Sequence, residues 1–391
     1  MRITRPRDDE PIRLVTNKSG VKYRAVVATG QHPDGRRRQE TRTFDTLRDA
    51  RDWVSETRLS VNRGTYTAPD RATVDAICTA WLDSKRDVRA VTLNTYATVL
   101  KAVRARLGAR KVQDVRRSDV EEFVSWLSAE GGRAGTGVSH RTVVLTLGTL
   151  RMVFAYSVAE GLIPASPVET VKPPRKRPQD ERRVTVWSTD ELARFIGTAD
   201  ADEWAACWRL TASGLRRSEV LGMTWDDLDQ EAGTVTVRQG RVGFGSRSEA
   251  VDAPKSKASA RTVPVEAMHP GTVALLRSLS AAQAAARLRA GEAWSESGFI
   301  LVDALGYPVR PEMYSDRFRE VCRQAGVPAI RLHDVRHSVA TLLHSAGTAP
   351  AHAAALLGHG LPVHMATYVT ATQDGVDLAG AALSRVLAEA K

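Results

Sequence analysis

Alternating apolar and polar positions near the N-terminus predict a small strand-rich unit that ends in a helix. Residues 21–30, VKYRAVVATG, have the two-residue period of a half-buried strand. A Pro-Asp-Gly turn in HPDGRRRQ leads to residues 40–44, ETRTF, as a partner strand. Residues 46–60 then place Leu47, Ala50, Trp53, Val54 and Thr57 at helical spacing. We expect a three-stranded sheet plus a helix over residues 1–65.

The next hundred residues, 70–168, have the three- and four-residue apolar spacing of helices. Ser118 followed by Glu121 has the pattern of a capping box. Pro164 and Pro167 are expected to stop the last helix. Four helices are predicted, in TVDAICTAWLDSK, TLNTYATVLKAVRARLG, RSDVEEFVSWLSAEG and SHRTVVLTLGTLRMVFAYSVAEGLI.

The remaining pattern predicts a linker and a larger module. Residues 169–187 are rich in proline and basic side chains, which is typical of a semi-rigid solvated connection. Residues 188–391 open on a capped helix, STDELARFI. GTVTVRQGRV and SARTVPV read as strands, and helices resume after Pro270. The expected fold class is therefore multidomain and mainly α, with a small antiparallel sheet in the last module.

Composition adds a class of protein to this picture. The 391 residues are 42% hydrophobic and 26% charged, as in ordinary globular proteins. We expect no transmembrane span and no signal peptide, because no run of eighteen apolar residues occurs and the N-terminus is charged. Cys78, Cys207 and Cys322 are odd in number and far apart, which favours reduced, buried thiols in a cytoplasmic protein.

The charge favours a polyanionic partner. The net charge is +11, and the basic residues are concentrated in two places. Residues 1–65 hold fifteen Lys and Arg against nine Asp and Glu, and residues 172–183 hold six against two. The arginines in and beside the predicted hairpin are consistent with a sheet presented to a DNA groove, and the linker with a segment laid along DNA.

The stretch RLHDVRHSVATLL, residues 331–343, has two chemical interpretations. His333 and His337 are four apart on a predicted helix, the spacing of a metal-binding pair. His333 and Arg336 also share a face, opposite a predicted core side, and Gly347 is placed to end the helix. The guanidinium repels a cation and attracts an oxyanion, which favours phosphate over metal. The predicted core side consists of Leu332, Val335, Val339, Leu342 and Leu343.

Four stretches in a fixed order carry a resemblance to a known family: LTASGLRRSEVLGMTW, APKSKASARTVPV, LHDVRHSVATLLHSAG and LLGHGLPVHMATYV. They contain a Gly-Leu-Arg…Glu box, a lysine hairpin, a His-x-x-Arg box, Leu-Gly-His and a tyrosine nine residues later. Together they closely resemble the catalytic motifs of the tyrosine recombinases, specifically phage-type integrases. The resemblance spans the chain and implies an α+β arm-binding domain (1–65), an all-α SAM-like core-binding domain (70–168), a linker (169–187) and a mainly α catalytic domain (188–391).

The resemblance implies a role for each matched residue. Tyr368 would attack the scissile phosphodiester and form a 3′-phosphotyrosyl link, which conserves bond energy without ATP. Arg216 and Arg336 would hold the non-bridging oxygens. His333 would bond the phosphate and help to move the tyrosine proton, and His359 would donate to the same phosphate. No cofactor and no metal are implied.

Some positions stay open or are given structural roles. The lysine that protonates the leaving 5′-oxygen is taken to be Lys255, with Lys257 as the alternative. Arg217 is passed over in favour of Arg216, and Glu219 is expected to buttress an arginine. His337 is interpreted as structural. Pro362 and His364 depart from the family pattern in this segment and leave the local backbone open.

We therefore expect a site-specific recombinase that integrates, and in some settings excises, a phage or other mobile element. The expected partners are attachment core and arm sites in double-stranded DNA, a homo-tetramer passing through a Holliday junction, a directionality factor and a host DNA-bending protein, with no membrane. The expected place is the bacterial cytoplasm, at the nucleoid. The C-terminal segment after Tyr368 is expected to pack on a neighbouring protomer. A DNA-binding protein without catalysis and a metal-dependent nuclease are the alternatives.

Overall fold

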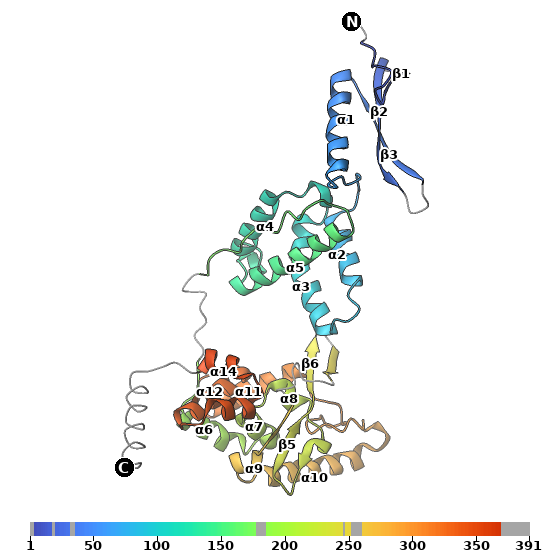
Figure 1. Cartoon of the computed structure of the whole chain (residues 1–391). Helices are drawn as coiled ribbons and strands as arrows, with labels where there is room; N and C mark the ends of the chain where they lie inside the picture. The colour runs from blue at the N-terminus through green and yellow to red at the C-terminus, as the bar shows by residue number, and fades with distance from the viewer. Residues whose placement is uncertain are drawn as a thin grey trace, which may run out of the picture. The chain divides into compact units, whose positions relative to one another are not determined.

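The computed structural model describes residues 4–17, 20–31, 36–176, 185–244, 247–251 and 260–368. The chain divides into two compact units, Met1–Glu181 and Arg182–Lys391 (Figure 1). Unit 1 contains a small sheet with one helix and, after it, a bundle of helices. Unit 2 contains the larger mixed module. Each unit has its own hydrophobic core, because none of the buried clusters contains residues of both units.

The N-terminal sheet consists of three antiparallel strands, β1 (Ile12–Asn17), β2 (Gly20–Gln31) and β3 (Arg37–Phe44), in the order β1-β2-β3. Helix α1 (Leu47–Asn62) covers one face, and Thr46 caps it by accepting from the Asp49 N–H. Alternate residues of β2 face this helix and form the core with it, as the two-residue period predicts. The core residues are Ile12, Tyr23, Ala25, Val27, Leu47, Ala50 and Val54. The predicted Pro-Asp-Gly turn lies outside the described residues.

Four helices follow: α2 (Val74–Asp83), α3 (Ala90–Leu107), α4 (Arg117–Ala129) and α5 (His140–Ala159). They share one apolar core, which confirms the helical periodicity. The predicted capping box at Ser118 and Glu121 is wrong. Helix α4 begins at Arg117 and its N-cap is Arg116, two residues before the predicted cap, so Ser118 lies inside its first turn. The Arg116 backbone N–H donates to the Asp119 carboxylate at 2.8 Å instead. Two 3₁₀ turns connect the helices, at Val112–Asp114 and Arg133–Gly135.

Within the described residues, α5 alone has the length and apolar composition of a membrane span. Its buried side, which includes Leu147, Leu150 and Phe154, lies in the middle of the helical core. We therefore interpret α5 as a core helix. It ends at Ala159, five residues before the predicted stop at Pro164, with the Glu160 N–H donating to the Tyr156 carbonyl.

Unit 2 begins with helices α6 (Thr189–Ala199), α7 (Ala205–Ala212) and α8 (Arg217–Leu221). The predicted cap of α6 is confirmed: Ser188 Oγ accepts from the Glu191 N–H, and the Glu191 carboxylate accepts from the Ser188 N–H. Strands β4 (Leu228–Asp229), β5 (Thr234–Val237) and β8 (Arg261–Val263) form an antiparallel sheet in the order β4-β5-β8. Strands β6 (Gly240–Phe244) and β7 (Arg247–Val251) form a separate hairpin.

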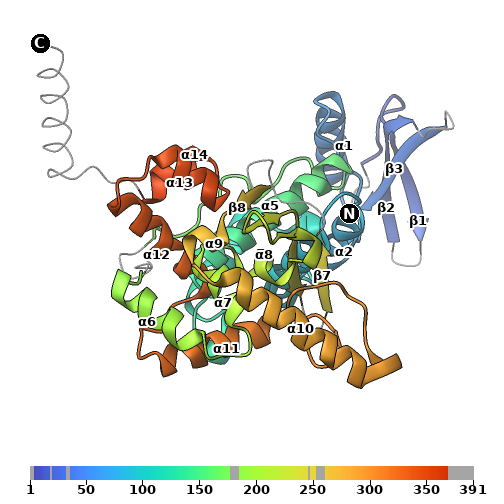
Figure 2. The same cartoon turned by 90° about the horizontal axis from the view of Figure 1, so that it is seen from below.

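The described part of unit 2 contains six further helices, with 3₁₀ turns at Trp225–Asp227 and Gly291–Ala293. Trp208, Phe195 and Phe318 are the aromatic centre of the core. The last three helices gather at one end of the unit, where α13 also contacts β8 (Figure 2). The expected class, mainly α with small antiparallel sheets, is confirmed. The six helices are α9 (Val265–Met268), α10 (Thr272–Ala290), α11 (Pro311–Gln324), α12 (Leu332–Ser345), α13 (Pro350–Leu357) and α14 (Leu361–Tyr368).

Candidate functional site

Three arginines from distant segments converge on the C-terminal end of α13, where they bond three successive carbonyl oxygens. Arg261 Nε donates to the Leu356 oxygen at 2.6 Å, and Arg216 Nη2 donates to the Gly358 oxygen at 2.9 Å. Arg336 Nη2 donates to the carbonyl between them, that of Leu357. The last carbonyls of a helix have no partner within the helix and carry partial negative charge. The end of α13 therefore attracts all three guanidinium groups to one turn.

Gly358 makes this approach possible. Its φ of 65° lies in the left-handed region, which follows the C-terminal end of many helices and favours glycine. A Cβ at this position would lie 2.6 Å from Arg261 Nη1, far inside van der Waals contact. Any other residue would strain the backbone and also displace the Arg261 side chain.

Glu219 is a second anchor for two of these arginines. Its Oε1 accepts from Arg216 Nη1 at 2.5 Å and from Arg261 Nη1 at 3.2 Å, and its Oε2 accepts from Arg261 Nη2 at 2.9 Å. Burial alone would raise the pKa of this carboxyl group, but the hydrogen bond from Arg261 and the charges of both arginines outweigh burial and lower it. Glu219 is therefore a buried carboxylate shared by two guanidinium groups, which is the buttressing role expected for it.

The two arginines predicted from the sequence differ in exposure. Arg336, on α12, is 2% exposed and also donates through Nη1 to the Gly214 oxygen at 3.0 Å. Arg216 precedes α8, and its side chain is 30% exposed. Arg217 turns away from this cluster and donates to Ser315 Oγ on α11 at 2.8 Å. The structure thus places Arg216, not Arg217, beside Arg336 at the end of α13.

Two histidines extend the cluster toward the last described helix. His359 Nδ1 is 2.8 Å from Arg336 Nη2, and His359 Nε2 is 2.9 Å from His364 Nδ1. Burial, then the charges of Arg336 and His364, lower the pKa of His359 to about 4, so its ring is neutral near pH 7. His364 is 1% exposed and sits on α14. Pro362 lies in the first turn of α14, where its missing N–H interrupts no helical bond, so the segment is a regular helix.

The stretch that suggested either a metal pair or a phosphate pair forms α12. The rings of His333 and His337 meet edge to face with centroids 4.9 Å apart. His333 is exposed, and its pKa is lowered by burial of part of the ring, then by the nearby charges of His337 and Arg336. No group of three or more His, Cys, Asp or Glu suited to a metal occurs among the described residues. The helix buries Leu332, Val335 and Val339 as expected, and Gly347 follows its end with a φ of 76°.

Two predicted site residues are placed only in part or not at all. Tyr368 is the last residue of α14, and its side chain is outside the described part of the structure. Lys255 and Lys257 lie outside the described residues, between β7 and β8. Their roles, and the choice between the two lysines, stay predictions.

Sequence reasoning missed Arg261, although SARTVPV, which contains it, was among the quoted motifs. Its side chain is only 7% exposed and joins Glu219 to the end of α13. The sequence pattern that could have identified Arg261 was a single arginine in SARTVPV, a short and otherwise uncharged stretch that includes β8. A buried arginine requires polar partners, and the acidic partner of Arg261, Glu219, is 42 residues away, beyond the reach of any local pattern.

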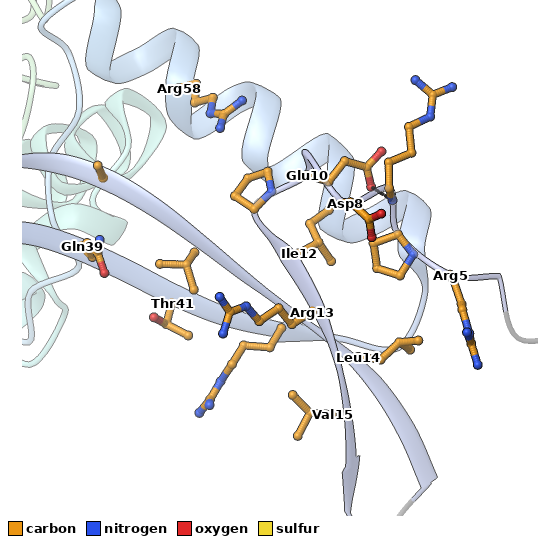
Figure 3. Close-up of a pocket in the computed structure, with 16 residues that line it drawn as sticks. Arg5, Asp8, Glu10, Ile12, Arg13, Leu14, Val15, Gln39, Thr41 and Arg58 are labelled. Atoms are coloured by element: carbon orange, nitrogen blue, oxygen red, sulfur yellow. Dashed lines mark hydrogen bonds between the residues drawn. The ribbon is translucent and has the colours of Figure 1, made fainter.

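A second concentration of arginine lies on the sheet of unit 1. Arg13 of β1 and Arg24 of β2 are directly opposite each other and belong to the strand face that α1 does not cover. Like charges in this position repel. In the described part of the chain neither side chain has an acidic partner, since Glu10 pairs with Arg51 and Asp45 with Lys22. Together with Arg5 and Arg58 they line a pocket that also includes Gln39 and Thr41 (Figure 3).

Family models match a part of each unit of the chain. Residues 188–374 match the phage integrase family, and residues 79–161 match the phage integrase N-terminal SAM-like domain. The tyrosine recombinase XerC-like protein of Caldanaerobacter subterraneus subsp. tengcongensis is 26% identical over 238 residues, which are 57% of this chain. The chain spans 60% of that relative's length.

Two solved structures share the fold. The Tn1549 transposon integrase in complex with transposon right end DNA superposes with a TM-score of 0.63 at 19% identity, over 80% of this chain and 99% of that one. A lambda integrase tetramer bound to a Holliday junction gives 0.53 at 17% identity, over 90% of this chain and 97% of that one. Both matched domains are present, and Arg216 and Arg336 bond the turn that precedes His359. This chain belongs to the phage integrase family of tyrosine recombinases.

Proposed function

We propose that this protein is a site-specific DNA recombinase that cleaves and rejoins DNA through a 3′-phosphotyrosyl intermediate, and so integrates or excises a phage or other mobile element. One observation carries the proposal. Three guanidinium groups and His359 converge on the turn after α13, and the next helix ends on Tyr368. A phosphodiester in this turn would meet fixed positive charge, and we propose that Tyr368 supplies the phenol that attacks it.

The chemistry assigns distinct tasks to the two predicted arginines. Arg216 is part-exposed, and its guanidinium can contact a non-bridging phosphate oxygen while Glu219 holds it from behind. Arg336 is buried and makes its bonds inside the protein, so it contributes fixed charge and orientation at the same place. Fixed donors stabilise the charge of a phosphoryl transition state without reorganising, and losing one costs about 3 kcal/mol.

Proton transfers fall to the histidines and a lysine. His333 is exposed and its lowered pKa leaves a neutral ring, which suits help with the tyrosine proton. His359 donates to the phosphate. Lys255, or else Lys257, protonates the leaving 5′-oxygen. Arginine and lysine charge provides the electrostatic stabilisation in this scheme.

The rest of the chain supplies contacts to DNA. Arg13 and Arg24 on the open sheet face are suited to the phosphates of an arm site, because an anion between them relieves their repulsion. The helical unit α2–α5 would contact the core site. The integrases named above were solved with transposon end DNA and, as a tetramer, with a Holliday junction. We extend that assembly to this chain, acting in the bacterial cytoplasm at the nucleoid, with a directionality factor and a DNA-bending protein as accessory partners.

The test is a search for the covalent intermediate. Sheared genomic DNA from a strain that carries the gene is nicked at random and incubated with the protein in EDTA. Where a nick lies close to the scissile bond, cleavage releases a short fragment that carries the 5′-hydroxyl needed for rejoining. Loss of this fragment by diffusion leaves the protein covalently attached to the 3′ end. We expect SDS-resistant protein–DNA adducts whose trapped 3′ ends share one sequence, and no adduct with Tyr368→Phe.

The same assay separates the alternatives. Retention of DNA without any adduct would favour a binding protein that lacks catalysis. Cleavage that requires a divalent cation and is abolished by EDTA would favour a nuclease. Lys255→Ala and Lys257→Ala, compared on an isolated trapped site, identify the lysine. A Lys255→Ala protein as active as the unmodified one would overturn the preferred choice.

A further inference from the structure

The hydrogen bonds around His359 determine where its proton lies. The Arg336 guanidinium has only donors, so His359 Nδ1, 2.8 Å from Arg336 Nη2, must accept. A neutral imidazole carries one N–H, which leaves the proton of His359 on Nε2. The pKa of about 4 keeps the ring in this neutral form at physiological pH. Arg336 therefore fixes the tautomer of His359.

That Nε2–H is directed at His364. The two nitrogens, His359 Nε2 and His364 Nδ1, are 2.9 Å apart, and the donor on one side requires an acceptor on the other. His364 thus has a bare Nδ1. Its ring is 1% exposed, and burial, with a smaller effect from His344, lowers its pKa, so it too is neutral. The pair is a directional bond from His359 to His364.

The bond joins two parts of the site. His359 follows the turn that the three arginines hold, whereas His364 lies inside α14. Tyr368 ends the same helix, one turn beyond His364. At the start of α14 the backbone hydrogen bonds are local, since the Val363 and His364 N–H groups donate to the Gly360 oxygen. The histidine pair therefore links α14 directly to the turn at the end of α13 that the three arginines bond.

We propose that His364 is a positioning residue that holds α14 against the turn Leu356–Gly358, which the three arginines bond. It does so until the scissile phosphate accepts the hydrogen bond from His359 Nε2 in its place. One N–H makes one strong hydrogen bond, so the phosphate and His364 compete for it. A bond to a charged phosphate oxygen is roughly twice as strong as a neutral one, so the phosphate wins. Occupation of the site then releases α14, and Tyr368 gains freedom to move when its target is present. This inference rests on the proposed function for the identity of the phosphate.

The test uses two substitutions of His364 in the full-length protein. His364→Asn keeps an acceptor near the position of Nδ1, and His364→Leu removes it while keeping apolar volume. Without DNA, ¹⁵N-histidine NMR of the unmodified protein should show His359 protonated on Nε2, with a coupling across the bond to His364 Nδ1. Amide exchange in α14 should rise about tenfold in the Leu variant and little in the Asn variant, as expected for one lost hydrogen bond.

Inorganic phosphate is then titrated into the same samples. In the unmodified protein and in His364→Asn, phosphate should speed amide exchange in α14, whereas in His364→Leu exchange is already fast and should not respond. The inference fails if His359 carries its proton on Nδ1, if the Asn and Leu variants behave alike, or if phosphate leaves exchange in α14 of the unmodified protein unchanged. These readouts need no strand cleavage. The proposed function fails separately, if the unmodified protein forms no covalent adduct.

Discussion

The arginines of unit 1 and those of unit 2 are the same side chain used in opposite ways. Arg13 and Arg24 project from an open sheet face and oppose each other across two strands. Arg336 and Arg261 are buried, and carbonyls and a carboxylate hold their guanidinium groups from several sides. Arg216 is intermediate, because Glu219 accepts a hydrogen bond from its guanidinium while the side chain stays partly exposed to solvent.

The exposed arginines of unit 1 are suited to DNA affinity, whereas the buried arginines of unit 2 are suited to a pre-organised site. A guanidinium in water contributes charge that salt screens and that an incoming phosphate must order. A guanidinium bonded to backbone carbonyls has already lost its side-chain freedom during folding, so a bound phosphate need not order it again. The open sheet is suited to binding a DNA backbone, and the end of α13 is suited to stabilising a transition state at one position.

The largest expected effect comes from making the same substitution in both regions. Arg336→Met leaves the Gly214 and Leu357 oxygens without their donor, which should weaken local stability at α12 and α13 by roughly 2–4 kcal/mol. Adduct formation should fall by at least a hundredfold, since about 3 kcal/mol of stabilisation is lost. Hydrogen exchange of α12 and α13 peptides and the adduct assay measure the two effects.

Arg24→Met is the matched control. Its side chain has no acidic partner in the described structure, so exchange in β1 and β2 should stay the same or slow slightly as repulsion with Arg13 disappears. Equal destabilisation by the two substitutions would contradict the distinction between the regions.

An intermediate effect is expected when both sheet arginines are removed. Arg13→Ala with Arg24→Ala removes two phosphate contacts, so the slope of log affinity against log salt should become shallower by about 2. Fluorescence anisotropy with duplex DNA at several salt concentrations gives the slope. Arg48→Ala with Arg63→Ala, in α1 and at its C-terminal cap, is the control for charge alone, because neither residue lines the pocket of Arg13 and Arg24. An equal change of slope would show that the sheet face has no special role.

The smallest effect is a pH dependence confined to unit 2. The pKa of Glu219 is lower in the folded protein than its ordinary value, despite burial, because Arg261 and Arg216 stabilise the charged form. The unfolded chain therefore binds the proton more readily. The stability from this group is complete above the ordinary glutamate pKa and is lost as pH falls through the lower folded value.

Hydrogen exchange of α8 and β8 peptides between pH 6 and pH 3, corrected for intrinsic rates, measures this loss. Glu219→Gln should flatten the pH dependence. A curve in the Gln variant as steep as in the unmodified protein would assign the acid sensitivity to another group.

The sequence was sufficient for much of the fold and for three of the residues that the structure gathers at the end of α13, whose roles in catalysis stay predictions. Periodicity identified α1 to α5, and the capping box of α6 was confirmed atom by atom. Ordered motifs identified Arg216, Arg336 and His359 because each motif is local, even though the fold brings them together from segments over a hundred residues apart. The failed capping box at Ser118 shows the limit of local patterns: Asp119 accepts the equivalent hydrogen bond from the Arg116 N–H, two residues earlier in the chain.

The sequence did not disclose which buried polar side chains are hydrogen-bonded to each other. Arg261 and Glu219 are 42 residues apart, and no local spacing relates them. His364 was noticed only as a departure from a pattern, since its meaning depends on the exact direction of the His359 ring. The hydrogen-bond partners of buried polar groups depend on how distant segments pack together, which a local sequence pattern does not contain.

The three arginines at the end of α13 are held by Leu356, Leu357 and Gly358 through main-chain oxygens, which every amino acid provides. The spacing between the guanidinium groups is therefore set by the rise of the peptide chain rather than by side chains. Exchanging Leu356 for another helix-forming residue preserves that spacing, whereas inserting or deleting a single residue before Gly358 shifts the register of all three at once. For anyone re-engineering this protein, the length of this turn is the quantity to keep constant, ahead of its composition.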